Sequence, residues 1–205
     1  MSLTLADAII EVRSALNEPT AVFWSDTEIT AWIKEGVRDF STKTLMVEAE
    51  ASVSLATGVI SYAVAACLEP YAALYNNKGL IKAHPRIIGN EATNTPGPPK
   101  YYSLFNRKLW VWPAPTASEN ATVITLLYAK QTDDIALVTD EYQHIPLYYA
   151  LAKAKFKDKM FAEGGAYMGL FTNFCSFERQ DKHGREQDSL DMFKIKTKGD
   201  ASGAK

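Results

Sequence analysis

The chain has 205 residues, of which 47% are hydrophobic, and its 22 basic and 24 acidic residues give a formal net charge of −2. This hydrophobic fraction predicts a sizeable buried core and excludes a disordered chain. The nearly balanced charge excludes the broad basic field on which autonomous nucleic-acid binding depends. Cys67 and Cys175 are too few for a disulfide framework, so we expect reduced thiols in a protein made in a cytosol, with no signal peptide or membrane span.

Two amphipathic helices are predicted at the N-terminus. Thr4 can cap a first helix with Asp7 three residues later, and this helix ends near Asn17. A clearer capping box, from Ser25 to Glu28, starts a second helix that runs to about Lys43. The apolar stripe of the second helix consists of Ile29, Trp32, Ile33, Val37 and Phe40. Because two short one-sided helices cannot hide their stripes alone, we expect them to pack on each other and on a later element.

The middle of the chain has the period of two that is typical of strands. Apolar residues from Val47 to Leu55 alternate with Glu and Ser, which predicts a strand with one wet face. Thr57-Gly58 then predicts a turn back into a strand at 59–64. Further strand candidates are 71–75, 80–82, the hairpin described next and 121–131, whereas 90–99 has the composition of a loop. The sequence therefore predicts a β-rich unit of five to seven strands.

A β-hairpin is predicted between Pro98 and Pro115, with Asn106-Arg107 as its two-residue turn. The predicted register pairs Phe105 with Lys108, Leu104 with Leu109, Ser103 with Trp110, Tyr102 with Val111 and Tyr101 with Trp112. One face is then wholly apolar or aromatic: Tyr102, Leu104, Leu109 and Val111. The other face carries Tyr101, Phe105, Trp110 and Trp112 beside Ser103 and Lys108. Such a hairpin is either buried on both faces or uses its second face against another chain.

Two more helices are predicted after the β-rich unit. Ile145 begins a helix that is apolar nearly all round as far as Ala154, which indicates a central position. Its lysines at 153, 155, 157 and 159 indicate either a solvated basic face or a surface that faces phosphates. Gly164-Gly165 is expected to break the chain before an aromatic helix with the stripe Tyr167, Leu170, Phe171, Phe174 and Phe177. One helical core is expected to contain Ile9, Val12, Trp32, Phe40, Leu151, Phe171 and Phe174.

These elements predict an α+β fold in which a helical layer is built from both ends of the chain and an antiparallel β-rich unit is inserted between them. The expected domains are a helical body at 1–45 and 140–188, a β-rich insertion at 46–139 and an extended, flexible C-terminal arm at 189–205. The arm carries Met192, Phe193, Lys194, Ile195 and Lys196, which contribute too few apolar residues to fold independently. The arm is either a binding segment or a solubilising tail.

No pattern of catalytic or ligand-binding residues emerges from the sequence. The three histidines are far apart, and no glycine-rich phosphate loop or nucleophile elbow is present. Asp133-Asp134 and Asp140-Glu141 lie where a turn and a helix start explain them better than catalysis does. We therefore expect neither an enzyme nor a metal or other cofactor.

The order of several motifs resembles a known family. The stretches are 5–18 (LADAIIEVRSALNE), 24–39 (WSDTEITAWIKEGVRD), 109–116 (LWVWPAPT) and 147–154 (LYYALAKA), followed by an aromatic helix. Over residues 3–187 the chain resembles the head-to-tail adaptors of tailed bacteriophages, called tail tubular protein A or gatekeeper proteins in short-tailed phages. The resemblance implies a structural virion protein at the head-tail junction, made in the host cytoplasm and without catalytic residues.

The resemblance also implies a set of partners. These are eleven further copies of the chain in a dodecamer, the portal protein on one side and a tail nozzle or tail tube protein on the other, with DNA passing through the channel without sequence-specific binding and no membrane. A terminal arm grips the portal in this family, which makes Met192 to Lys196 the candidate portal-binding segment. The lysines at 153–159 depart from the family pattern and leave the charge of a channel wall open.

Two alternatives belong to other functional classes. In the first, Trp110 and Trp112 form a stacking platform of a carbohydrate-binding tail module. In the second, the carboxylates between Asp133 and Glu141 serve a hydrolase, whose activity would disappear when they are neutralised while assembly stays intact.

Overall fold

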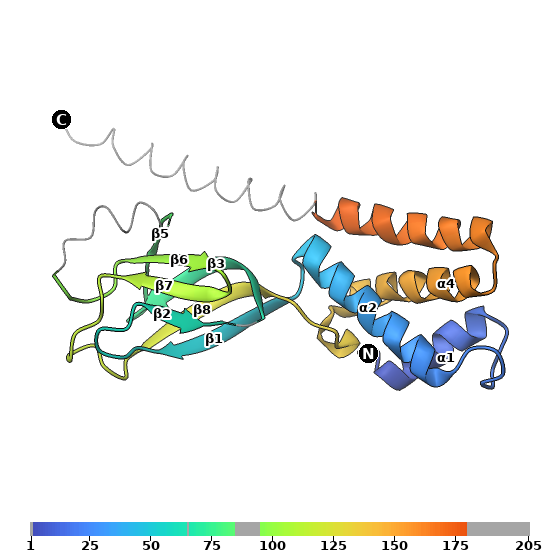
Figure 1. The fold of residues 1–205 in the computed structure, drawn as a ribbon, viewed down its shortest axis with the longest axis horizontal. Coiled ribbons are helices and arrows are strands. Elements are labelled where there is room, and N and C mark those ends of the chain that lie inside the picture. The colour runs from blue at the N-terminus through green and yellow to red at the C-terminus, as the bar shows by residue number, and fades with distance from the viewer. Residues whose placement is uncertain (1, 65, 85–94, 180–205) are drawn as a thin grey trace, which may run out of the picture. The chain divides into compact units, whose positions relative to one another are not determined.

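The computed structural model describes residues 2–64, 66–84 and 95–179 and has the expected α+β class. Contacts along the chain divide it into two compact units. The first takes in the described residues of Met1–Met46 and Asp133–Lys205 and is helical, and the second is Val47–Thr132 and contains all the strands among the described residues. Figure 1 shows the elements of each unit, which are described separately below.

The helical unit contains α1 (Leu5–Ala15), α2 (Asp26–Thr44), α4 (Ile145–Lys157) and a last helix at 161–179. Both predicted capping boxes are confirmed, because Thr4 and Asp7 exchange hydrogen bonds at the start of α1, as do Ser25 and Glu28 at the start of α2. Two short 3₁₀ helices, η1 (Ile135–Leu137) and η2 (Asp140–Tyr142), precede α4.

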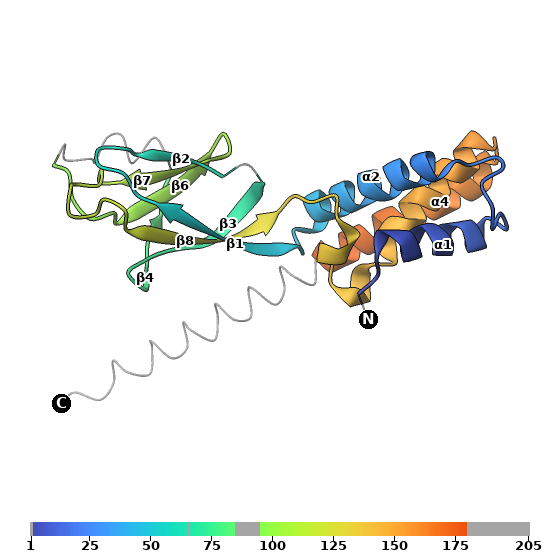
Figure 2. The same ribbon diagram turned by 90° about the horizontal axis from the view of Figure 1, so that it is seen from below.

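Helix α4 is central in this unit, as its nearly uniform apolar sequence predicts. It packs on α2 and α1, and the ring of Phe171 on the last helix meets Tyr149 of α4 edge to face. Helices α2 and α4 approach closely at Gly36, where an added Cβ would lie 2.8 Å from the carbonyl oxygen of Pro146. Only a glycine allows the two backbones to come this near. Figure 2 shows α4 between α2 and α1.

The expected helical core is confirmed in part. Val12, Phe40, Leu151 and Phe171 are buried, but Ile9, Trp32 and Phe174 are only half-buried. The aromatic stripe of the last helix therefore does not face inward as a whole, and Phe177 at its end is 65% exposed. The buried line of this helix instead runs through Gly164, Phe171 and Cys175.

The expected break at Gly164-Gly165 is wrong. Both glycines lie inside the helix at 161–179, and the chain turns earlier, where Lys159 has a positive φ of 60°. Glycine weakens a helix by only about 1 kcal/mol, a penalty that tertiary packing can offset. The packing concerned is that of Gly164 against α4.

The described residues of the β unit form eight strands in two sheets. The strands are β1 (Glu48–Ser54), β2 (Ser61–Ala63), β3 (Cys67–Tyr75), β4 (Lys78–Gly79), β5 (Ile81–Lys82), β6 (Tyr101–Phe105), β7 (Lys108–Trp112) and β8 (Val123–Lys130). The first sheet has the order β1-β8-β3-β4 and the second β2-β7-β6-β5. The two sheets face each other as a sandwich, seen edge-on in Figure 2.

The predicted hairpin is confirmed pair by pair, from Tyr101 opposite Trp112 to Phe105 opposite Lys108. Its turn residues Asn106 and Arg107 have φ values of 52° and 55°, the left-handed conformation that a type I′ turn requires. The wet face of β1 is confirmed as well, because Glu48, Glu50, Ser52 and Ser54 are exposed while the residues between them are half-buried.

The strands of the β unit pair differently from their order along the chain. The turn at Thr57-Gly58 does not bring β2 beside β1; β1 pairs with β8, and β2 joins the other sheet beside β7. The inserted unit is also not purely antiparallel, because β5 runs parallel to β6, with Ile81 beside Tyr101. A local turn signal specifies the reversal of the chain but not the sheet that the next strand enters.

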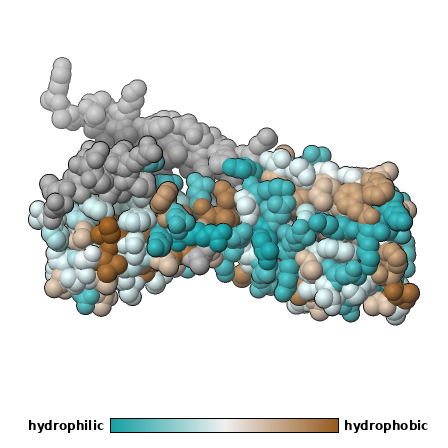
Figure 3. Space-filling view, in the orientation of Figure 1, coloured by the Kyte–Doolittle hydropathy of each residue, from teal (hydrophilic) through white to brown (hydrophobic). Residues whose placement is uncertain are grey.

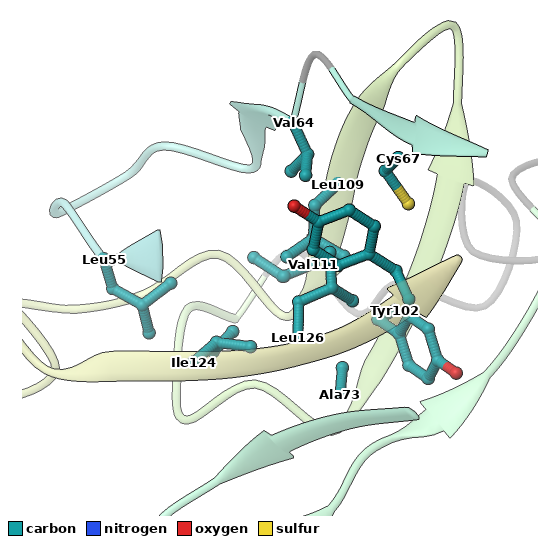
Figure 4. Close-up of a cluster of buried hydrophobic side chains, with 10 residues drawn as sticks. Leu55, Val64, Cys67, Ala73, Tyr102, Leu109, Val111, Ile124 and Leu126 are labelled. Carbon is teal, nitrogen blue, oxygen red and sulfur yellow. The ribbon is translucent and has the colours of Figure 1, made fainter. Parts of the chain in front are cut away.

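The core of the sandwich lies between the two sheets. Tyr102, Leu109 and Val111 of the second sheet meet Ile124 and Leu126 of the first, and all five are at most 2% exposed. Figure 4 shows these side chains directed toward one another. Three of the four residues on the inward face of the predicted hairpin are thus buried, whereas Leu104 is half-buried, and the other face points away from the core.

Candidate functional site

The second face of the β6–β7 hairpin carries large apolar side chains that the β unit does not bury. Phe105 is 61% exposed and Tyr101 36% exposed, while Trp110 and Trp112 are half-buried. All four project from the sheet on the side opposite to the core, because they alternate with Tyr102, Leu104, Leu109 and Val111 along their strands. The sequence-predicted assembly residues therefore share one partly exposed surface.

A fifth apolar residue extends this surface. The parallel pairing of β5 with β6 places Ile81 beside Tyr101, and Ile81 is 60% exposed. Sequence reasoning missed Ile81 because a two-residue parallel strand has no periodicity of its own. We refer to Ile81, Tyr101, Phe105, Trp110 and Trp112 as the apolar outer face.

The apolar outer face differs from the corresponding side of the first sheet. There, β1 presents Glu48, Glu50, Ser52 and Ser54 to solvent. A sheet with one solvated face normally has such polar residues outside. The contrast with β1 makes the apolar outer face the candidate surface for a partner.

The apolar outer face rests on a rigid base. Nε1 of Trp110 donates a hydrogen bond to the carbonyl oxygen of Phe105 at 3.4 Å, which holds the indole toward the turn. Beneath it, the Tyr102 hydroxyl donates to the carbonyl oxygen of Tyr71 at 3.5 Å, and burial raises the pKa of this tyrosine. A partner would therefore meet a preformed surface and would pay little ordering entropy on the hairpin side.

A second apolar surface lies on the helical unit, in the loop between α1 and α2. The side chains of this loop are exposed, Val22 by 85% and Phe23 by 49%. Its backbone is held in place, because the N–H groups of both residues donate to Oε1 of Glu18 at 2.5 Å. The guanidinium of buried Arg13 braces the loop by donating to Asp26 and to the carbonyl oxygen of Trp24. Brown atoms gather at the right-hand end of Figure 3, where Figure 1 draws this loop.

Sequence reasoning missed this loop. Its signal is a pair of large apolar residues, Val22 and Phe23, between Pro19 and the capping box at Ser25. A loop that is held rigid by a carboxylate and an arginine while its apolar side chains stay exposed is typical of an interaction surface.

The lysines of α4 are matched by carboxylates. Nζ of Lys153 lies 3.3 Å from Glu35, that of Lys155 2.8 Å from Glu163 and that of Lys157 2.7 Å from Glu28. The hydrogen bond from Lys157, together with those from Ser25, lowers the pKa of Glu28 to about 2. These pairs favour the solvated, charge-balanced face over a surface that faces phosphates.

The acidic residues before α4 have structural contacts. Asp133 pairs with Arg38 at 3.3 Å, and Asp134 accepts the backbone N–H of Ala136 as the cap of η1. Burial raises the pKa of Cys67 to about 11 and that of Cys175 to about 12, so both thiols are protonated at neutral pH. Within 2–64, 66–84 and 95–179, no group of three His, Cys, Asp or Glu side chains could hold a metal ion.

Two further observations concern membrane-spanning helices and the C-terminal segment. No helix in the described part of the chain is long and apolar enough to cross a membrane. The candidate portal-binding segment Met192 to Lys196 lies outside the described residues, so its contact with a portal stays a prediction.

Comparison with known proteins agrees with the resemblance at the level of a phage adaptor. A family model described as "SU10 adaptor protein" matches residues 3–187, which include every element described above. No curated protein matches the chain. This match indicates that the chain is a structural adaptor protein of a phage virion. The chain belongs to the SU10 adaptor protein family.

Proposed function

We propose that the chain is a head-to-tail adaptor of the tail tubular protein A or gatekeeper kind. In this proposal, twelve copies form a ring between the portal protein and a tail nozzle or tail tube protein, and the ring continues the channel for DNA. The subunit would be made in the host cytoplasm and would become part of the head-tail junction on assembly.

The observation that carries the proposal is the apolar outer face. Five large apolar side chains on a rigid sheet leave a surface that water solvates poorly, and burial against a neighbour gains roughly 25 cal/mol for each Å² of apolar area removed from water. Aromatic residues with a charged residue, here Lys108, at their border are typical of protein interfaces. In a ring, each copy would place this face against the next copy or against an adjoining tail protein.

The charge distribution supports passage of DNA without specific binding. The formal net charge is −2, and Lys153, Lys155 and Lys157 each form an ion pair with a carboxylate of the same unit. Strong phosphate binding requires cations that are free to replace the counterions of DNA. A channel that must release DNA quickly benefits when its lysines are neutralised by such ion pairs.

The proposal can be tested with single substitutions on the apolar outer face. Phe105→Ser removes an exposed side chain, so the subunit should keep its melting temperature while ring formation and attachment to portal-bearing heads are lost. Trp110→Ser should act in the same way with some loss of stability, because Trp110 is half-buried. Val123→Ser is the matched control, since Val123 is 43% exposed on β8 of the other sheet. Circular dichroism reports folding, and electron microscopy of the protein mixed with portal complex reports rings.

Rings stacked on portals for the wild type and the Val123→Ser protein, but not for Phe105→Ser, would support the proposal. Normal rings from both hairpin variants would contradict it. The carbohydrate-binding alternative predicts that wild-type monomers ignore portals and that Trp110→Ser abolishes binding to a glycan array.

A further inference from the structure

The first sheet ends in a long open edge. Among the described residues, β1 pairs with β8 alone, and all seven residues of β1 pair in continuous register from Glu48 opposite Ala129 to Ser54 opposite Val123. The strand contains no proline and no bulge. Proteins normally protect an undistorted edge of this length, because its free backbone groups form a template for another strand.

The hydrogen bonds of β1 show which residues face the open side. Val47 accepts from the N–H of Lys130 at 2.7 Å, and Leu55 donates to the carbonyl of Thr122 at 2.8 Å, so odd-numbered residues bond to β8. In an antiparallel ladder the residues between them direct N–H and C=O away from the partner strand. Glu50, Ser52 and Ser54 therefore offer their backbone groups to an additional strand.

The side chains of β1 also lack a neighbour on this side. Ala49, Ala51 and Val53 point toward the core but are only half-buried, whereas Ile124 and Leu126, opposite Val53 and Ala51 on β8, are 0% exposed. Within the described residues no cation forms an ion pair with Glu50 on the outward side. A matching strand would bring large apolar side chains to the inward side and cations to the outward side.

One segment of the chain has this pattern. In Phe193-Lys-Ile-Lys-Thr-Lys198, the residues Phe193, Ile195 and Thr197 alternate with three lysines. Phenylalanine, isoleucine and threonine favour strands, and strict alternation is the signature of a strand with one apolar and one charged face. Set against β1, the lysines would share the outward face with Glu50, and Phe193 and Ile195 would cover the half-buried alanines.

We propose that residues 193–198 of one copy add a strand to the β1 edge of a second copy, in place of the portal contact that the family resemblance implies for Met192 to Lys196. This pairing rests on the proposed ring, because it links adjacent subunits, and it deepens that proposal by naming the contact. Backbone hydrogen bonds would hold the segment, and the Lys-to-Glu50 complementarity would fix which side faces outward. Pairing of β1 with another β1 is disfavoured, because it would bring the glutamates of both strands onto one face.

The experiment uses full-length chains and amide hydrogen exchange. An isotope-labelled chain with Ile195→Pro cannot pair through its own segment, since proline lacks the N–H and disrupts a strand. When it is mixed with unlabelled wild type, the amides of Glu50, Ser52 and Ser54 in the labelled chain should exchange about tenfold more slowly, the effect of a contact worth about 1.4 kcal/mol. Unlabelled Ser202→Pro should protect equally, because its proline lies beyond the segment, whereas unlabelled Ile195→Pro should not.

Charge reversal tests the alignment of the faces. A donor with Lys194→Glu and Lys196→Glu should lose protection of wild-type β1 and regain it against Glu50→Lys. Fast exchange of the labelled amides in every mixture would overturn the proposal. So would protection in the wild-type chain that does not change on dilution and is not passed to the labelled chain, because the segment would then pair with β1 of its own chain. Electron microscopy of the same Ile195→Pro protein with portal complex tests ring formation independently of this pairing. Rings formed while β1 stays unprotected would overturn the pairing but would leave the adaptor function supported.

Discussion

The aromatic ring of Phe156 on α4 fills the space in which Gly164 of the last helix would carry a side chain. A Cβ built on Gly164 would lie 2.5 Å from Cδ1 and 2.6 Å from Cε1 of Phe156, closer than carbon atoms approach in proteins. Gly164 is buried and lies inside the helix at 161–179. The absence of its side chain allows the last helix to approach α4.

We therefore expect Gly164→Ala to destabilise the helical unit. An alanine in an exposed helix gains about 0.5–1 kcal/mol over glycine, but overpacking of a filled site costs about 1–3 kcal/mol. The adjacent Gly165→Ala is the control, because nothing lies within 4 Å of its added Cβ. Thermal unfolding should show a lower melting temperature for Gly164→Ala and an equal or higher one for Gly165→Ala. A gain in both would mean that the Phe156 ring moves aside freely.

A second prediction concerns the core of the helical unit. Phe171 is 0% exposed and contacts Tyr149, so Phe171→Ala should cost about 3–5 kcal/mol of unfolding free energy. Phe174 stacks on Tyr148 but is only half-buried, and its replacement by alanine should cost clearly less. Urea titration of both variants measures the difference.

Phe177→Ala completes this series as a control on the same helix. Phe177 is 65% exposed, so its replacement should change stability by no more than about 0.5 kcal/mol in the free subunit. Equal losses for all three variants would show that the last helix unfolds as a whole and that burial of single residues does not decide its stability.

Local features were predictable from the sequence because neighbouring residues determine them. Thr4 with Asp7 and Ser25 with Glu28 form their capping boxes within one turn of helix, and the Asn106-Arg107 turn fixes the register of the strands on either side of it. The partners of β1 and β2 were not predictable in this way. Their pairings join residues far apart in the chain, such as Ser54 with Val123, and no local pattern specifies them.

The same distinction applies to the candidate site. Tyr101, Phe105, Trp110 and Trp112 were placed on one face by the hairpin register alone. Ile81 joins them through a parallel pairing across a long loop, and the exposed pair Val22 and Phe23 depends on Glu18 holding the loop. The helical position of Gly164 likewise depends on its contact with Phe156. From composition alone, two adjacent glycines predict a break in the helix.

The turn of the hairpin gives a third prediction. Arg107 has a φ of 55°, which costs free energy in every residue except glycine, and type I′ turns favour Asn-Gly. Relief of about 1–2 kcal/mol of left-handed strain should exceed the entropy cost of glycine, about 0.5–1 kcal/mol, so Arg107→Gly should raise the unfolding free energy by about 0.5–1 kcal/mol. Lys108→Gly is the control, because glycine in a strand should lower it by a similar amount. If Arg107→Gly destabilised the β unit instead, the arginine side chain would have to make a stabilising contact.

The last prediction concerns the pH dependence of the ion pair between Glu28 and Lys157. The pKa of Glu28 is lowered from 4.5 to about 2, chiefly by the hydrogen bond from Lys157. A carboxyl whose pKa is lower in the folded state stabilises the fold above its unfolded pKa and loses this contribution as the pH falls through the folded value. Glu28→Gln keeps an acceptor for Ser25 but removes the charge, so it should lower the melting temperature at pH 7. The difference from wild type should shrink as the pH falls from about 4.5 toward 2. Glu11→Gln, on the exposed side of α1, is the control and should leave the melting temperature at pH 7 unchanged. A Glu28→Gln profile that stays parallel to wild type at every pH would refute the assigned pair.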